Sequence, residues 1–288
     1  MAQRRRGRGA SLIAVGLVLA VTVAALVWVP RLWERLNDEP AASSRCTVAV
    51  AERSDTKTAE QANNTALIVA GSMRWGLPAR AGTIGVATAI QESSLRNIDY
   101  GDRDSLGLFQ QRPSQGWGTE NEIMDPHYAT DRFYEALIKV AAWTEMEITD
   151  AAQEVQRSGF PLAYADHEEE GRLWASALTG NGGTITCDLD QPIEPTTTRA
   201  FAGRLAADFG EDAYVVEVVG TDGDDTVLRV TGADALANSA VQRWAVAVAA
   251  HEQVTSAVSA TAQWVRDGSA PPPAPESAVT VTLRTRAD

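Results

Sequence analysis

Histidine, cysteine and clustered basic residues are scarce in this chain, and these scarcities limit the functions open to it. Its 288 residues include 3 histidines and 2 cysteines, and 38 acidic residues against 25 lysines and arginines give a formal net charge of −13. Nucleic-acid binding depends on cationic side chains that displace counterions from phosphates. Because the chain is acidic and has no basic patch interleaved with aromatic residues, we expect no nucleic-acid partner.

Motifs of metal, nucleophile and nucleotide chemistry are also missing. The sequence contains no HExxH, no GxSxG and no phosphate-binding glycine loop. This excludes zinc peptidases, serine hydrolases with that motif and phosphate-loop enzymes. The acids Asp99, Asp102 and Asp104 lack the spacing of a calcium-binding EF-hand loop. We therefore expect no metal ion and no cofactor.

One long uncharged run is present near the N-terminus. Residues 11–29 carry no charge, and as a helix they extend about 28 Å, close to the hydrocarbon thickness of a bilayer. The basic tail before them, residues 1–10, favours a cytoplasmic N-terminus and an extracytoplasmic body. We predict a single-pass transmembrane helix at 11–29 in the cell membrane, followed by a stalk at 30–45. The alternative is a signal peptide, but the nearest small-residue cleavage candidate, residues 41–43, lies far beyond the apolar core.

The two cysteines, Cys46 and Cys187, both follow the predicted anchor. An extracytoplasmic compartment permits a disulfide. A bridge between these residues ties the start of a domain to its end, and we predict that it forms. Its Cα atoms should then lie within about 7 Å of each other. Two unpaired buried thiols are the alternative.

Apolar residues at helical spacing dominate residues 46–187, which we predict to form one mainly α domain around a long polar loop. The composition of residues 188–198 is typical of a linker. Residues 199–288 mix helical and strand patterns, which predicts a small α+β domain of unknown role that offers a surface to a possible protein partner. Within the first domain, the expected helices are 64–73, Pro78 to about Glu92, Pro126 to about Val140, 150–157 and 161–178, with the loop at 93–125.

The most informative stretch joins the end of the second predicted helix to the polar loop. Glu92 ends an apolar, alanine-rich helix, where partial shielding from water and the helix dipole both raise a carboxyl pKa, as a general acid requires. Ser93 is a hydrogen-bonding group suited to sugars. Further on, Gly107 allows close backbone approach, Gln110 offers an amide, and Trp117 offers an apolar face for a pyranose ring.

These residues carry a resemblance to known glycan-cleaving proteins. The pair Glu92-Ser93, followed by the run GLFQ from Gly107 to Gln110, resembles the first two motifs of lytic transglycosylases and goose-type lysozymes. The longer runs GLFQQRPSQGWGT and IMDPHYATDRFY resemble lysozyme-like domains of actinobacterial and phage cell-wall proteins, and the similarity covers roughly residues 60–180. The resemblance implies a lysozyme-like fold of the α+β lysozyme superfamily for the mainly α domain, and peptidoglycan glycan strands as its substrate. It also implies that Glu92 protonates the glycosidic oxygen, that Ser93 orients it, and that the Gly107 backbone and Gln110 line the saccharide groove.

The sequence departs from the transglycosylase pattern in two places. Phe109 replaces the more usual methionine, and no clear AYNAG-type third motif is present. The nearest candidate for that motif is Ala163-Tyr164-Ala165, so we predict Tyr164 as a groove residue. Core packing is the alternative role for Tyr164, as it is for Trp117.

A second carboxylate decides between two mechanisms. A hydrolase typically needs two carboxyl groups, about 5 Å apart for retention and about 6.5–9.5 Å for inversion, and the candidates are Asp99, Asp102, Asp104 and Asp125. A transglycosylase needs only Glu92, acting first as acid and then as base while a hydroxyl of the sugar attacks. We favour the transglycosylase. The rival of another class is a non-catalytic wall-binding or scaffold module of a cell-envelope apparatus, which does not require a carboxyl at the helix end.

Overall fold

The part of the chain with a described structure begins after the predicted anchor. The computed structural model describes residues 44–159, 162–190, 192–266, 275 and 277–285. The predicted basic tail, the transmembrane helix and nearly all of the stalk therefore lie outside the described residues. Within those residues, no helix is both long enough and apolar enough to cross a membrane.

The described chain is α+β from its start, and the prediction of a mainly α lysozyme-like domain followed by a small α+β domain is wrong. Two antiparallel sheets are present, one with the strand order β2-β1-β3 and the other with the order β4-β5-β8-β6-β7. The strands are β1 (Arg45–Val50), β2 (Arg53–Thr58), β3 (Thr184–Asp188), β4 (Tyr214–Asp222), β5 (Asp225–Gly232), β6 (Val254–Val258), β7 (Gln263–Val265) and β8 (Val279–Arg284). The α-helices are α2 (Ala59–Arg74), α3 (Ala79–Ser93), α4 (Glu120–Ile123), α5 (Pro126–Leu137), α6 (Ile148–Gln156), α7 (Glu168–Leu178), α8 (Thr198–Phe209), α9 (Ala235–Ala247) and α10 (Ala249–Glu252), with short 3₁₀ turns η1 (Pro113–Gln115) and η2 (Ala163–His167).

The three-stranded sheet is the element that overturns the mainly α prediction. β1 pairs with β2, its neighbour in the chain, and with β3, from the far end of the predicted first domain. In this register Cys46 lies opposite Cys187, and the two form a disulfide with their Cα atoms 4.0 Å apart. The predicted bridge is therefore confirmed. The disulfide links the central strand β1 to the edge strand β3. It therefore joins the two ends of the segment, residues 46–187, that carries the candidate site.

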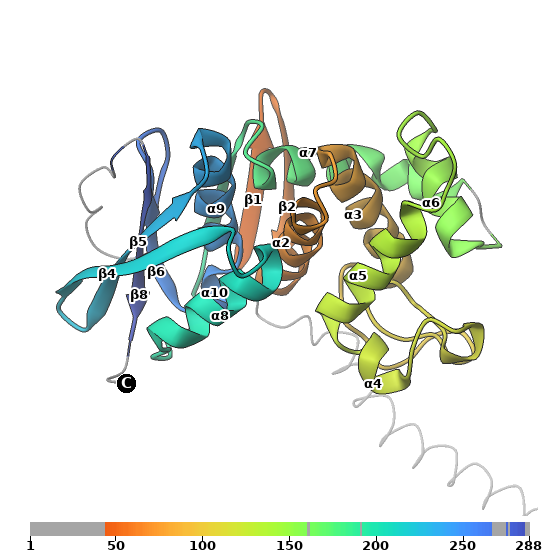
Figure 1. Ribbon diagram of the computed structural model, residues 1–288, viewed down its shortest axis with the longest axis horizontal. Coiled ribbons are helices and arrows are strands. Elements are labelled where there is room, and N and C mark those ends of the chain that lie inside the picture. Colours follow the sequence, from red (N-terminus) through yellow and green to blue (C-terminus); the bar gives the residue numbers. More distant parts are fainter. Residues whose placement is uncertain (1–43, 160–161, 191, 267–274, 276, 286–288) are drawn as a thin grey trace, which may run out of the picture. The chain divides into compact units, whose positions relative to one another are not determined.

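Segments predicted as two domains share one core. The described residues belong to a single compact unit, and α9 contacts β5, β6 and β8 as well as β3, α7 and α2. Figure 1 shows α9 between the two sheets. Trp244 of α9 is fully buried, and the Trp264 indole N–H donates to the carbonyl oxygen of Cys187 at 2.9 Å. The predicted linker thus connects elements that pack on one another.

A buried carboxylate strengthens this junction. Asp208, near the end of α8, is fully buried and accepts hydrogen bonds from Nε2 of His127 at 2.7 Å, Nε of Arg204 at 2.8 Å and Nε1 of Trp244 at 2.7 Å. Burial by itself raises the pKa of Asp208, but these three donors outweigh it and hold the pKa below its ordinary value. The charge therefore joins α5, α8 and α9.

We expect Asp208→Asn to lower the free energy of unfolding by about 2 kcal/mol or more at neutral pH, because it removes the charge that these donors bind. Since the folded pKa of Asp208 is depressed, its stabilisation is present above the ordinary aspartate pKa and is lost as pH falls through the depressed value. Urea unfolding of the unsubstituted chain and of Asp208→Asn, at neutral and at strongly acidic pH, measures the difference in the free energy of unfolding. A difference of the same size at both pH values would contradict a role for the charge.

Candidate active site

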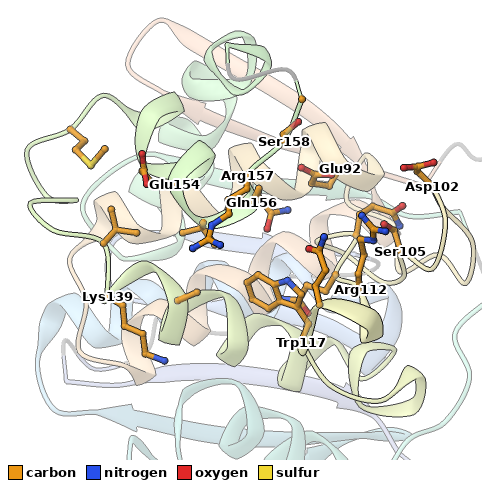
Figure 2. Close-up of a pocket in the computed structure, with 18 of the residues that line it drawn as sticks. Glu92, Asp102, Ser105, Arg112, Trp117, Lys139, Glu154, Gln156, Arg157 and Ser158 are labelled. Atoms are coloured by element: carbon orange, nitrogen blue, oxygen red, sulfur yellow. The ribbon is translucent and has the colours of Figure 1, made fainter.

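A cleft of about 1280 Å³ lies beside the C-terminal end of α3. Its lining comes from α3, from the loop between α3 and α4, and from the region of α5 and α6 on the opposite wall (Figure 2). Three of the predicted site residues line it: Glu92, Gln110 and Trp117. The other three, Ser93, Gly107 and Tyr164, are buried and are not among its lining residues.

Glu92 is in the last turn of α3, a helix whose alanines and glycines pack closely against the core. Its side chain is half-buried, and the hydroxyl of Tyr164 donates to its Oε1 at 2.7 Å. Burial raises the pKa of Glu92, and hydrogen bonds from Tyr164 and Gln156 lower it without cancelling that rise. The carboxyl therefore keeps its proton to a higher pH than an ordinary glutamate, as a general acid requires.

Tyr164 is the predicted site residue that contacts the carboxyl itself. It lies in η2 and is fully buried, so its ring packs in the core while its hydroxyl faces Glu92. Burial and the neighbouring Glu92 carboxylate both raise the pKa of Tyr164. The phenol accordingly stays a neutral donor, and its position fixes the orientation of the carboxyl.

Ser93 and Gly107 join the two sequence motifs to each other. The buried Ser93 hydroxyl donates to the carbonyl oxygen of Leu108 at 2.7 Å, which leaves it unavailable to a sugar. Gly107 has a φ of +76°, and a Cβ there would lie 2.7 Å from the carbonyl oxygen of Ile123, so this position requires glycine. Together they hold the loop so that Gln110 reaches the cleft.

Gln110 and Trp117 form the wall on the loop side. The Gln110 amide nitrogen lies 3.3 Å from the carbonyl oxygen of Tyr100, to which it donates. The Trp117 indole packs partly against the core and also lines the cleft. Part of the side chain is therefore used in core packing, and another part is open to a sugar ring. The Tyr128 hydroxyl donates to the carbonyl oxygen of Trp117 at 3.2 Å and steadies the backbone there.

Two of the candidate second carboxylates have structural partners. Asp104 accepts hydrogen bonds from the backbone N–H and the hydroxyl of Ser114 and from Nε of Arg112, at 2.8, 3.0 and 3.1 Å. These bonds, those of Ser114 first, hold the pKa of Asp104 far below its ordinary value. Asp125 caps the start of α5 by accepting backbone N–H groups. Both acids therefore shape the loop.

The remaining two candidates differ in position. Asp99 is exposed and lies outside the cleft lining, whereas Asp102 is exposed and lies within it. Figure 2 shows Asp102 near one end of the cleft and Glu92 further in. Asp102 is therefore the predicted second carboxylate that a hydrolytic mechanism has available.

Sequence reasoning missed the opposite wall. Lys139, Glu154, Gln156 and Arg157 line the cleft there, and the amide of Gln156 donates to the carbonyl oxygen of Phe109 at 2.8 Å. They lie at or after the ends of helices and form no motif, so only the packing of α5 and α6 against α3 brings them to the site. The apolar period of α6 predicts a helix but not which residues surround its end.

The described residues contain no group of three or more histidine, cysteine, aspartate or glutamate side chains placed to hold a metal ion. Comparison with models of known protein families finds none that matches this chain, and comparison with curated protein sequences finds no match either. We therefore infer the function from the residues of the cleft and their chemistry.

Proposed function

We propose that this chain cleaves the glycan strands of peptidoglycan, with Glu92 as the acid and then the base of a lytic transglycosylase reaction. The observation that supports the proposal is the environment of the Glu92 carboxyl. It lies in a large cleft, burial raises its pKa, and the Tyr164 hydroxyl holds Oε1 at 2.7 Å. The resemblance of the Glu92-Ser93 and GLFQ motifs to those of lytic transglycosylases supports a glycan as the substrate.

The reaction needs one proton carrier. Protonated Glu92 gives its proton to the glycosidic oxygen as the bond from that oxygen to the anomeric carbon breaks. The carboxylate that results takes the proton of a hydroxyl on the same sugar, and the oxygen of that hydroxyl bonds to the anomeric carbon. No water is consumed, and Glu92 is protonated again at the end. The hydrogen bond from Tyr164 stabilises the carboxylate between the two steps.

A lysozyme-type hydrolase is the second candidate, and the presence of Asp102 in the cleft lining favours it. In that mechanism a second carboxylate activates a water molecule or attacks the sugar. Mass spectrometry of peptidoglycan digested by the full chain distinguishes the two, because anhydro ends and reducing ends differ by one water. Absence of both products would contradict an enzymatic function.

We expect Tyr164→Phe to move the basic limb of the pH–rate profile to higher pH. The hydroxyl stabilises the charged form of Glu92, so its loss raises the pKa of that carboxyl further. A general acid works below its pKa, so activity should persist to higher pH. The maximal rate should fall, by about tenfold, because the carboxyl loses its fixed orientation. Rates of glycan release measured across pH test this, and a limb that moves to lower pH contradicts it.

We also propose that cleavage takes place outside the cell membrane, with residues 11–29 as the anchor. The disulfide between Cys46 and Cys187 supports this compartment, because cytosolic thiols are kept reduced. Protease added to intact cells should remove the body of the protein, and the mature chain should keep Met1 or Ala2 at its start. Recovery of a secreted form beginning near residue 43 would show that the anchor is cleaved.

A further inference from the structure

The cleft has two unlike arms on either side of Glu92. The loop arm is mainly polar. It is lined by Ser105, Gln110, Gln111 and Gln115, together with Asp102, Trp117 and Arg112, whose guanidinium is paired with Asp104. The α5–α6 arm has an apolar wall of Ala136, Val140, Ala141, Met146 and Val155, with the cations Lys139 and Arg157. In Figure 2 the guanidinium of Arg157 points into the cleft, between Glu92 and Lys139. The second arm also contains the polar Gln156 and Ser158, but only the first arm is lined mainly by groups that hydrogen-bond to the hydroxyls and amides of a sugar.

The two cations of the α5–α6 arm are available to an anion. Among the described residues, no carboxylate forms an ion pair with Arg157, and the pair of Lys139 with Glu135, at 2.8 Å, is a solvent-exposed one. Such exposed pairs are weak and exchange readily. The arm also contains one acid, Glu154, which Figure 2 shows pointing away from Arg157. A chain of net charge −13 therefore presents two cations, Lys139 and Arg157, on one arm of its cleft.

The backbone at Arg157 gives no reason for an arginine. This residue ends α6 in the left-handed conformation, with a φ of +52°. Glycine fits that conformation best, and a side chain there is strained. Seven other described non-glycine residues also have a positive φ, so this conformation by itself marks no site. The side chain of Arg157, and not its backbone, is thus the feature that needs an explanation.

We propose that the α5–α6 arm binds the stem peptide of peptidoglycan, with Arg157 and Lys139 on its carboxylates, while the loop arm takes the sugars. This inference rests on the proposed function. Stem peptides carry carboxylates and short alkyl side chains, which match two cations on an apolar wall. Arginine pairs with carboxylate through two parallel hydrogen bonds, which fixes the peptide as well as attracting it. The site therefore selects glycan that still bears its peptides.

The test measures binding by the full chain carrying Glu92→Gln, so that no ligand is cleaved. The two ligands are soluble glycan fragments with stem peptides, and the same fragments stripped of peptide by an amidase. Removal of the peptide leaves a lactyl carboxylate on the sugar, so both ligands carry a carboxylate. Tighter binding of the first ligand is therefore due to its peptide. We expect that preference to fall about tenfold with Arg157→Gly, to fall with Lys139→Gln, and to weaken in high salt.

The glycine variant suits the backbone at position 157, so its loss of binding is not a loss of fold. Arg229→Gln, which removes an exposed arginine of β5, is the matched control and should leave the preference unchanged. Equal affinity for the two ligands, or a preference that Arg157→Gly leaves intact, overturns the inference. Absence of binding to either ligand overturns both the inference and the proposed function. Cleavage by the unsubstituted chain, assayed separately, tests the proposed function alone.

Discussion

Replacing Glu92 with glutamine should abolish glycan cleavage. Glutamine keeps the size of the side chain and can accept the hydrogen bond of Tyr164, but it cannot deliver a proton to the departing sugar oxygen. General acid catalysis alone contributes about 10²–10⁴ in rate, and in the proposed reaction the same group also acts as the base. Cleavage, measured as release of soluble glycan fragments, should therefore fall by at least about a hundredfold.

The same substitution should leave the fold intact. Since the folded pKa of Glu92 is raised, the protonated carboxyl stabilises the chain at low pH, and that stabilisation is lost as pH rises through the folded pKa. A neutral amide avoids this loss, because it carries no charge to be buried. At neutral pH the thermal midpoint of Glu92→Gln should equal or exceed that of the unsubstituted chain.

Two further variants make the result specific. Glu169→Gln makes the same chemical change at an exposed position of α7 and should leave cleavage unchanged. Asp102→Asn should matter little to a transglycosylase but should disable a hydrolase that uses this residue as its second carboxylate. Near-normal cleavage by Glu92→Gln would show that Glu92 is not the acid. Absence of cleavage by the unsubstituted chain, in contrast, would favour the non-catalytic wall-binding module.

The helix that carries Glu92 could be predicted because its signals are local. Pro78 precedes the first turn, apolar residues recur at helical spacing, and the helix occupies Ala79–Ser93, close to the predicted span from Pro78 to about Glu92. α2 shows the limit of the same reasoning. A capping box made by Thr58 and Gln61 starts it at Ala59, five residues before the predicted start at residue 64.

The three-stranded sheet was missed because its pairing is not local. β2 reads RSDTKT and has no buried residue, so pairing with β1, and not its own composition, makes it a strand. β3 does alternate, with Ile185 and Cys187 buried between exposed neighbours, but five residues are too few to separate a strand from a loop. Its partner lies about 140 residues earlier in the chain.

Within the site, sequence motifs predicted which segments meet but not which way each side chain points. The motif predicts Ser93 as a substrate-binding residue that also orients Glu92, and in the structure its hydroxyl donates to the carbonyl oxygen of Leu108 in the other motif. Tyr164, 72 residues from Glu92, could be nominated only from a partial motif, and its bond to the carboxyl depends on how η2 packs on α3. The cations of the α5–α6 arm belong to no motif at all.

Removing the disulfide should produce the largest loss of stability among these variants. The bridge closes a loop with a sequence separation of 141 residues, and the lost chain entropy of so large a loop corresponds to about 4–5 kcal/mol. That is a large share of the about 5–15 kcal/mol by which folded domains are stable. Cys46 and Cys187 lie opposite each other in paired strands and are both buried, so the double variant Cys46→Ala, Cys187→Ala keeps the register and loses the covalent constraint.

Urea unfolding with and without a reductant isolates the contribution of the bridge. The unsubstituted chain, once reduced, should unfold at nearly the midpoint of the double alanine variant, and the variant itself should not respond to reductant. Because β3 packs on α9, where Trp244 is buried, unfolding followed by tryptophan fluorescence should shift together with unfolding followed by circular dichroism. If the reduced and oxidised chains unfold at the same urea concentration, the bridge does not restrict the unfolded chain, and the stability of the junction between β1 and β3 comes from strand pairing and packing alone.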